Sequence, residues 1–339
     1  MAMGSRFIVA AVALLLAGAA APALAQAGSG KWTADAKTGC RVWNEVPGKD
    51  DGVSWSGDCA NGMAQGKGEL QWTVAGKPGD KYVGEMRNGR LHGRGVYTWE
   101  NGDRREGEFN DGQAEGYGVF VWGDGARYEG EFRADRFDGQ GVLVQVDGAR
   151  YDGQWRDDVR HGRGLETFAN GDRYDGEWRN DMRHGSGVEI LADGERYDGE
   201  WHEDRRHGQG TAVFADGSRY EGQWRDGVFE GRGIMTDKSG RYEGEWLDGL
   251  RHGQGSWVAA NGDRYVGEFA EDDFNGTGEF TWADGRRYQG QYRQSRPHGQ
   301  GSYRDKDGNL FAGEWHGGCF SMGERKAWIG ATKEECGFK

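Results

Sequence analysis

The chain has 339 residues, with 64 glycines, 15 tryptophans, 4 prolines and a formal net charge of −13. So much glycine without a collagen triplet indicates a repeat with many fixed turns, and an aromatic content of 12% argues against disorder. The acidic balance disfavours nucleic acid and anionic lipid as generic partners, because both attract basic surfaces.

Residues 1–25 have the pattern of a secretory signal peptide. Arg6 supplies a short positive region, residues 7–21 are apolar or small, and an A-x-A cleavage signal ends at Ala25. A membrane anchor is the alternative, but the apolar run is short for a span and ends at Pro22. We expect an exported chain, periplasmic or secreted, whose net charge goes from −13 to −14 because cleavage removes Arg6 and no acid.

A period of 23 residues runs through the middle of the chain. The stretches YDGQWRDDVRHGRG, YDGEWRNDMRHGSG and YDGEWHEDRRHGQG follow one another at this spacing. A fixed period of 20 to 50 residues is typical of a repeat architecture. The spacing is 22 residues once, between Tyr220 and Tyr242, and a less regular copy of the repeat begins at Trp55. Residues 55–318 therefore hold about twelve repeat units. The aligned first positions are Tyr82, Arg105, Tyr128, Tyr151, Tyr174, Tyr197, Tyr220, Tyr242, Tyr265, Tyr288 and Phe311.

Each unit predicts two short strands. Tyr-x-Gly-x-Trp alternates with period two, which is typical of a strand with one apolar face, and its other face carries charges of both signs such as Arg173 and Asp175. These charges can pair with neighbouring strands. The second strand follows Gly-x-Gly and ends in Asn-Gly or Asp-Gly, as at Asp193-Gly194. Such pairs favour positive φ at both central positions of a tight hairpin turn, and here they link one unit to the next.

Stacking of the units gives the fold class, an all-β, elongated array of antiparallel hairpins. Glycine two positions after each tyrosine leaves room for the aromatic rings to lie over the backbone. One hairpin alone is marginal in water, so neighbouring units must cover each other's rings. With strands about 4.8 Å apart and two per unit, twelve units would extend on the order of 100 Å.

The four cysteines lie near the two ends of the expected array. Cα atoms must lie within about 7 Å for a disulfide, and an elongated body keeps its ends further apart than that. This leaves the pairs Cys40–Cys59 and Cys319–Cys336 as staples in an oxidising compartment, with free redox thiols as the alternative. Residues 26–54 and 319–339 are then expected to be N-terminal and C-terminal caps.

These residues resemble the MORN repeat (membrane occupation and recognition nexus), whose pattern runs Tyr-x-Gly-x-Trp, a turn, then His-Gly-x-Gly. The resemblance covers about residues 55–318. It implies an extended sheet of hairpins whose aromatics line a groove, and a scaffold role with a peptide or helix of a partner in that groove. It also implies that catalytic domains, where such repeats accompany them, lie outside the repeats, and here no stretch is left for one.

Other chemistry is weakly indicated. Six histidines share one phase: His92, His161, His184, His207, His252 and His298. Neighbouring copies should lie about 10 Å apart, whereas zinc needs nitrogens about 2 Å away, so we expect no shared metal. We expect these histidines to be polar turn residues that hydrogen-bond the backbone before a glycine. A metal between His202 and His207 is the alternative. The repeated carboxylates share one environment, unlike a glycosidase pair, and no phosphate-binding loop is present. We expect no enzyme and no cofactor.

The first functional hypothesis is a non-catalytic scaffold that binds an extended segment of a partner protein through an aromatic groove. A glycan-binding or envelope-surface-binding module is the alternative, because exposed aromatic rings can also stack on sugars. The candidate groove residues are Tyr151, Trp155, Tyr174, Trp178, Tyr197, Trp201, Tyr220 and Trp224.

Overall fold

A computed structural model describes residues 30–49 and 51–338, so the expected signal peptide lies outside the described residues. The described chain contains 28 strands and no helix, which confirms the all-β prediction. Accordingly, no helix that could cross a bilayer is found among these residues. The chain forms two compact units, and each is described by itself. Of the described residues, the first unit holds those up to 123 with 130–138 and 156–158, and the second holds 124–129, 139–155 and 159–338.

The first unit is organised around the long strand β5 (Met63–Val74). This strand pairs antiparallel with β3, β4 and β6 and touches β2 in parallel at Arg41 and Met63. From β5 to β9 each strand pairs antiparallel with the next. The other strands are β1 (Lys31–Ala34), β2 (Arg41–Asn44), β3 (Asp51–Trp55), β4 (Asp58–Ala60), β6 (Lys77–Arg87), β7 (Arg90–Thr98), β8 (Arg104–Asn110) and β9 (Gln113–Val121).

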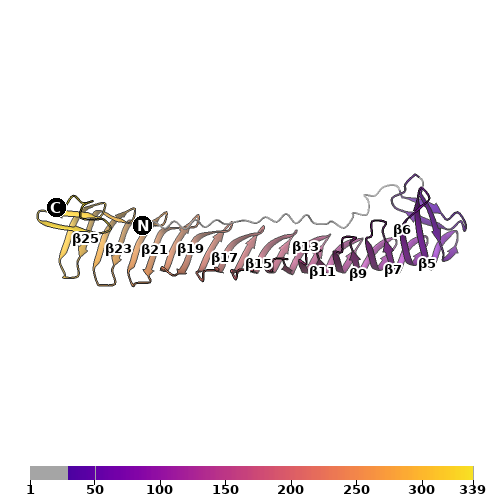
Figure 1. Ribbon diagram of the computed structural model, residues 1–339, viewed down its shortest axis with the longest axis horizontal. Helices are drawn as coiled ribbons and strands as arrows, with labels where there is room; N and C mark the ends of the chain where they lie inside the picture. Colours follow the sequence, from indigo (N-terminus) through magenta and orange to yellow (C-terminus); the bar gives the residue numbers. More distant parts are fainter. Residues whose placement is uncertain (1–29, 50, 339) are drawn as a thin grey trace. The chain divides into compact units, whose positions relative to one another are not determined.

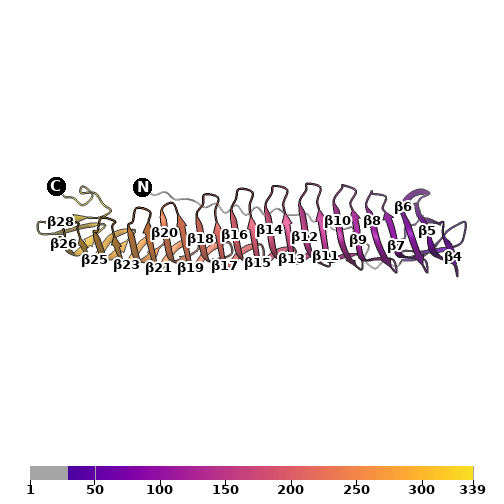
Figure 2. The same ribbon diagram turned by 90° about the horizontal axis from the view of Figure 1, so that it is seen from below.

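The second unit is a succession of hairpins in chain order (Figure 1; Figure 2). From β13 to β28 each strand pairs antiparallel with the next. The strands β10 (Arg127–Arg133), β11 (Arg136–Val144) and β12 (Arg150–Arg156) have residues in both units. The strands of the second unit alone are β13 (Val159–Thr167), β14 (Arg173–Arg179), β15 (Met182–Ile190), β16 (Arg196–His202), β17 (Arg205–Val213), β18 (Arg219–Arg225), β19 (Val228–Asp237), β20 (Gly240–Leu247), β21 (Leu250–Ala259), β22 (Arg264–Ala270), β23 (Asp273–Thr281), β24 (Arg287–Arg293), β25 (Arg296–Arg304), β26 (Leu310–His316), β27 (Cys319–Met322) and β28 (Arg325–Trp328).

The two-residue turn lies inside each repeat, after Tyr-x-Gly-x-Trp. Between β14 and β15, Asn180 and Asp181 have φ of 52° and 66°, and the flanking residues Arg179 and Met182 pair directly. This is the tight turn that matches strand twist and requires positive φ twice. The sequence analysis placed the tight turn at the Asn-Gly and Asp-Gly pairs that follow the second strand of each repeat, and that location was wrong.

The Asp-Gly sites form a longer loop instead. At Asp193-Gly194 only the glycine has positive φ, 94°. The Leu191 amide donates to the Glu195 carbonyl at 2.8 Å, and the Gly194 amide donates to the Leu191 carbonyl at 2.9 Å. The Asp193 carboxylate accepts the Glu195 amide at 2.9 Å, so the aspartate side chain bridges the loop while the glycine alone takes positive φ. These loops link successive repeats, as predicted.

A β-bulge gives the second strand of each repeat its shape. The pairing of β14 with β15 shifts after Gly176, so that Glu177 faces His184. Gly185 takes φ of 57° in the bulge. The Glu177 carboxylate accepts the Ser186 amide at 3.1 Å and so satisfies a donor that the ladder leaves unpaired. The same bond is accepted by Gln154, Glu200, Gln223, Glu245, Glu268 and Gln291.

The tyrosine rings lie over glycine, which confirms the role predicted for these glycines. A β-carbon on Gly187 would lie 2.4 Å from the Tyr174 hydroxyl, and one on Gly176 would lie 2.5 Å from it. That hydroxyl donates to the Glu177 carbonyl at 3.0 Å. The indole of Trp201, from the next repeat, donates to the Gly187 carbonyl at 3.2 Å. Rings and backbone therefore interlock between repeats.

Candidate interaction surfaces

The first-strand rings form the interior of the repeats. We call the side of each sheet that carries them the ring face and the opposite side the charged face. Tyr174 meets Trp178 of its own strand at 5.2 Å and Trp201 of the next repeat at 5.3 Å between ring centroids, both edge to face. Burial raises the pKa of Tyr174 above its ordinary value. The eight candidate groove rings are only 0–7% exposed: Tyr151, Trp155, Tyr174, Trp178, Tyr197, Trp201, Tyr220 and Trp224.

These eight rings therefore offer a partner little surface, and their role in binding stays a prediction. The accessible part of the ring face comes from side chains of the second strands and of the loops that follow them. Sequence analysis did not single out these positions, because their residue type changes from repeat to repeat. In the second unit, these positions carry charged side chains in the central repeats and aromatic side chains towards the C-terminal end.

Arginines cover the rings in the central repeats. The guanidinium of Arg183 lies 4.2 Å from the centre of the Trp201 ring and pairs with Glu189 at 2.5 Å. Its backbone amide and its Nε donate to the Asp204 carboxylate in the next turn at 2.9 and 3.2 Å. Arg206 pairs with Glu189 at 2.9 Å and thereby joins two repeats. The ring face here is a network of charges over aromatic rings, where cation–π and ionic contacts reinforce each other.

Glu166 occupies the same phase as Glu189 one repeat earlier. It is 5% exposed and accepts the Arg160 guanidinium at 2.6 Å. Burial raises the pKa of Glu166, and the positive charge of Arg160 opposes that shift.

Towards the C-terminal end of the second unit, the accessible side chains of the second strands and loops on the ring face are aromatic. Trp257, Phe274, Phe280 and Trp282, which we call the C-terminal aromatic cluster, are all half-buried. Phe274 is 6.0 Å from Trp257 and 5.9 Å from Phe280, and Phe280 is 4.6 Å from Trp282, between ring centroids. Arg286 lies 5.0 Å from the centre of the Trp282 ring. The cluster is the largest set of adjoining half-buried rings that we find on the ring face of this unit.

The charged face carries ion pairs along single strands. Arg150 pairs with Asp152 at 2.7 Å and Arg196 with Asp198 at 2.7 Å, two residues apart on one strand and half exposed. Similar pairs within one strand are Arg104–Glu106, Arg127–Glu129, Arg219–Glu221 and Arg241–Glu243. Pairs between neighbouring strands, which the sequence analysis predicted, occur as well: Lys67–Glu85 at 3.4 Å and Arg94–Glu108 at 3.3 Å. Exposed pairs of this kind add little stability.

The in-phase histidines lie on strands at the bulge, so the expectation of turn residues was wrong. His184 faces Glu177, and its nearest imidazole belongs to His202, 5.2 Å away between ring centroids. His202 is in turn 5.6 Å from His207. Within residues 30–49 and 51–338, no three histidine, cysteine or carboxylate side chains converge as metal ligands would.

Two disulfides are present, in the pairing that the sequence predicts. Cys40 and Cys59 have Cα atoms 5.7 Å apart, and Cys319 and Cys336 have Cα atoms 5.5 Å apart. The first bridge lies in the first unit and the second bridge lies in the second unit.

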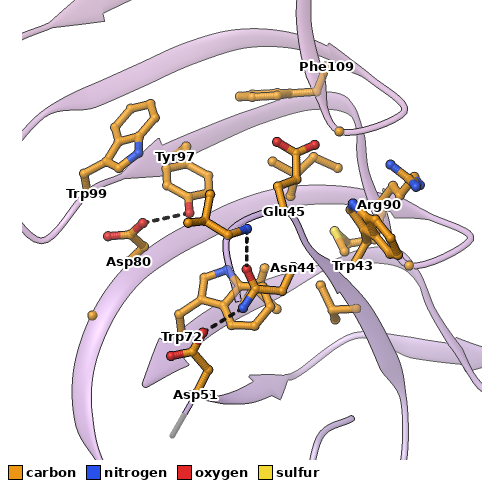
Figure 3. A pocket seen from close by; sticks show the side chains of 18 of the residues that line it. Trp43, Asn44, Glu45, Asp51, Trp72, Asp80, Arg90, Tyr97, Trp99 and Phe109 are labelled. Carbon is orange, nitrogen blue, oxygen red and sulfur yellow. Dashed lines mark hydrogen bonds between the residues drawn. The ribbon is translucent and has the colours of Figure 1, made fainter. Parts of the chain in front are cut away.

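The first unit also encloses a cavity of about 410 Å³, which no sequence motif indicated. Figure 3 shows its labelled side chains, with the Glu45 carboxylate among aromatic rings. The cavity lies between the segment 42–51 and the ring face of β5 to β8, to which Trp72 and Tyr97 belong. Sequence analysis missed it because residues 26–54 carry no repeat from which their placement could be read.

Comparisons with known proteins bear on the family and much less on the site. Among curated proteins, none matches the chain. Among solved structures, the chain is similar to the TCP domain of SAS-4 of Drosophila melanogaster in complex with a proline rich motif of Ana2, with 11% identity over 57% of this chain and 81% of that chain and a TM-score of 0.20. It is also similar to virginiamycin B lyase from Staphylococcus aureus, with 9% identity over 84% and 91% of the chains and a TM-score of 0.14. Likenesses at these scores carry no argument about function.

The sequence profile of the MORN repeat matches eleven segments, which together cover more than half of the chain. They are residues 56–74, 82–104, 106–127, 128–150, 151–173, 174–196, 197–219, 220–240, 242–264, 265–286 and 288–310. Their boundaries follow the hairpin units of the structure, with the tyrosine at the start of most segments. The chain therefore belongs to the MORN repeat family.

Proposed function

We propose that the protein is a non-catalytic interaction scaffold that holds an extended peptide or a helix of a partner protein on the ring face of the second unit. The C-terminal aromatic cluster carries this proposal. Half-buried tryptophan and phenylalanine side chains that adjoin one another are the residues on which binding energy concentrates at interfaces. The first-strand rings beneath them supply rigidity, so the cluster is presented without a large ordering cost.

The neighbouring charges supply specificity. Arg183, Arg206 and Glu189 lie on the same face as the cluster and remain partly accessible, with side chains 21%, 16% and 14% exposed. A partner with alternating charges would bind next to this network, whereas a like-charged segment would be repelled. Binding that uses these charges weakens as salt is added.

Capture of partners by paired variants tests the proposal. One bait carries Trp257→Ala and Trp282→Ala on the ring face. Its matched control carries Val258→Ala and Val266→Ala on the charged face, where both valines are 40% exposed. We expect one defined protein to bind the wild type and the valine variant with the same affinity, and the tryptophan variant at least about tenfold more weakly. Equal retention by all three baits would contradict the proposal.

Glycan binding is the second candidate, because Trp257 and Trp282 also offer half-buried indole faces on which a sugar ring can stack. The two candidates differ in their response to salt. A protein segment held partly by Arg183 and Glu189 should dissociate more readily at high ionic strength, whereas sugar stacking should not. Binding of a polysaccharide that is unchanged by salt and lost in the tryptophan variant would favour the second candidate.

We also propose that the protein is exported and that residues 26–54 and 319–339 cap the array. Two disulfides support an oxidising compartment. Exposed sheet edges invite pairing with other chains, so an array of this kind needs a cap at each end. Trp43 donates its amide to the Gly89 carbonyl at 2.9 Å, and Ile329 donates to the Gly318 carbonyl at 2.8 Å, so both ends are hydrogen-bonded beyond the repeats. Analysis of the mature N-terminus tests export: it should begin at Gln26.

A further inference from the structure

The cavity in the first unit has the size and the lining of a small-molecule site. Its volume of about 410 Å³ lies within the range usual for ligand pockets. Trp43, Trp72, Tyr97, Trp99 and Phe109 contribute aromatic surface to its wall (Figure 3). All of them except Trp43 come from the repeat strands or the loop that follows β7, so the pocket forms where the N-terminal segment covers the ring face.

The lining is acidic. Five carboxylates line the cavity against two guanidinium groups, a net charge of −3: Glu45, Asp51, Asp80, Glu100, Asp135, and Arg90 and Arg105. An acidic, aromatic cavity favours a cation, because π faces and carboxylates both attract positive charge.

Both guanidinium groups already have partners. Arg105 pairs with Asp135 at 2.8 Å and lies 4.7 Å from the centre of the Phe132 ring. Arg90 lies 4.6 Å from the centre of the Trp43 ring and pairs with Asp111 at 3.5 Å. Neither arginine forms an ion pair with Glu45, and Arg90 acts on that carboxylate only through its charge.

Three of the other four acids, Asp80, Asp51 and Asp135, have hydrogen-bond partners, whereas the carboxylates of the exposed Glu100 and the half-buried Glu45 have none among the described residues. Asp80 accepts the Tyr97 hydroxyl at 3.0 Å and the Glu100 amide at 2.9 Å, and Asp51 accepts the Asn44 amide at 2.9 Å. The Glu45 carboxylate has no hydrogen bond or ion pair to any residue of the described chain. Burial raises the pKa of Glu45, the charge of Asp135 raises it further, and Arg90 opposes both.

We infer that this cavity binds a small organic ammonium ion, with the charged nitrogen beside Glu45 and its alkyl groups against Tyr97, Trp99 and Trp72. Such a cation would form an ion pair with the Glu45 carboxylate, which has no ion pair within the described chain. It also gains cation–π contacts with rings that are already in place. A neutral molecule of the same shape would leave the carboxylate unpaired in a partly desolvated site. This inference does not depend on the scaffold function, which uses a different unit.

Calorimetric titration of the full chain tests the inference. The probes are choline, propylammonium, and dimethylbutanol, the uncharged carbon isostere of choline. Glu45→Gln preserves the shape of the side chain and removes its charge. Glu203→Gln, a carboxylate of the second unit without an ion pair, is the matched control. We expect one saturable site for at least one ammonium probe in the wild type and in Glu203→Gln. We also expect affinity to fall about tenfold or more in Glu45→Gln, with no binding of dimethylbutanol.

The pH dependence supplies a second readout that a purely structural role of Glu45 would not give. The cation binds the ionised carboxylate, so affinity should fall as pH is lowered through the raised pKa of Glu45, and binding should release protons in that range. The inference is overturned if neither ammonium probe binds the wild type. It is equally overturned if Glu45→Gln binds as tightly as the wild type or if the uncharged isostere binds as well as choline.

Discussion

At the residue scale, one side-chain oxygen in each repeat accepts a hydrogen bond from the backbone amide that the bulge leaves unpaired. Position three after the tyrosine is Glu177 in one repeat and Gln154 in another, and both accept a backbone amide of the following strand. The oxygen matters here and the charge does not, because glutamate and glutamine make the same bond. The sequence analysis treated the glutamates only as repeated carboxylates that share one environment. The alternation of glutamate with glutamine was the signal that pointed elsewhere.

We therefore predict that Glu177→Gln leaves stability almost unchanged, whereas Glu177→Ala costs about 1 kcal/mol because the Ser186 amide loses its acceptor. Urea unfolding gives the overall change, and hydrogen exchange at Ser186 gives the local one. Exchange at Ser186 should accelerate only in the alanine variant. Equal effects of the two substitutions would show that the charge is what stabilises the bulge.

Gly187 and Gly194 provide a matched pair for the ring packing. A β-carbon on Gly187 would overlap the Tyr174 ring, whereas one on Gly194 would meet nothing within 4 Å. Gly187→Ala should cost about 3 kcal/mol through forced displacement of the ring. Gly194→Ala should cost only about 1 kcal/mol through its positive φ. Thermal unfolding with near-ultraviolet circular dichroism checks both, and comparable losses would mean that the rings do not lie over the glycine row.

At the element scale, the turn between the two strands of a repeat is strained in some copies. Glu203 has φ of 48°, a conformation that costs a glutamate more than it costs asparagine or glycine. Other copies place Asn88 or Asp226 at this position, each followed by glycine. The repeat thus tolerates poor turn residues because the strands on both sides fix the backbone.

Glu203→Asn should raise the free energy of unfolding by about 0.5 kcal/mol, because asparagine takes positive φ more readily. Glu203→Gln is the control, since glutamine resembles glutamate in size and backbone preference and should change nothing. Chemical denaturation of both variants checks the prediction. A gain in the glutamine variant would point to relief of charge repulsion instead of backbone strain.

The elements were largely predictable from the sequence, and the accessible surface was not. The alternation in Tyr-x-Gly-x-Trp predicts a strand and places both rings on the same face of it. Because the rings are large, the residue beneath them must be glycine, so the contact between ring and glycine could be predicted as well. The turn types were exchanged because Asp193-Gly194 resembles a tight turn, whereas the aspartate side chain bonds within a longer loop. The C-terminal aromatic cluster and the cavity at Glu45 depend on residues that do not repeat, so no periodic signal marks them.

At the scale of the whole molecule, the buried tyrosines link stability to alkaline pH. Burial raises the pKa of each of them above the ordinary value of about 10: Tyr82, Tyr151, Tyr174, Tyr197, Tyr220, Tyr242, Tyr265 and Tyr288. Between the ordinary and the raised pKa, the folded chain binds more protons than the unfolded chain. Stability is therefore fully present below about pH 10 and falls as pH rises above it.

We expect alkaline titration to show steep, cooperative unfolding. Most of the tyrosinate absorbance should appear together with the loss of the β-sheet signal in far-ultraviolet circular dichroism. Titration of most tyrosines near pH 10 with the sheet signal intact would mean that their hydroxyls are open to solvent in the folded protein.

The central claim is that first-strand rings build the repeats while second-strand and loop rings remain available for binding. Hydroxyl-radical footprinting of the free protein, read out at individual tryptophans, tests it most directly. The account predicts that Trp257 and Trp282 are oxidised several-fold faster than Trp178 and Trp201, which are each 4% exposed. Oxidation of Trp178 and Trp201 as fast as that of Trp257 and Trp282 would contradict this claim. It would mean that the first-strand rings are accessible and can form the binding groove.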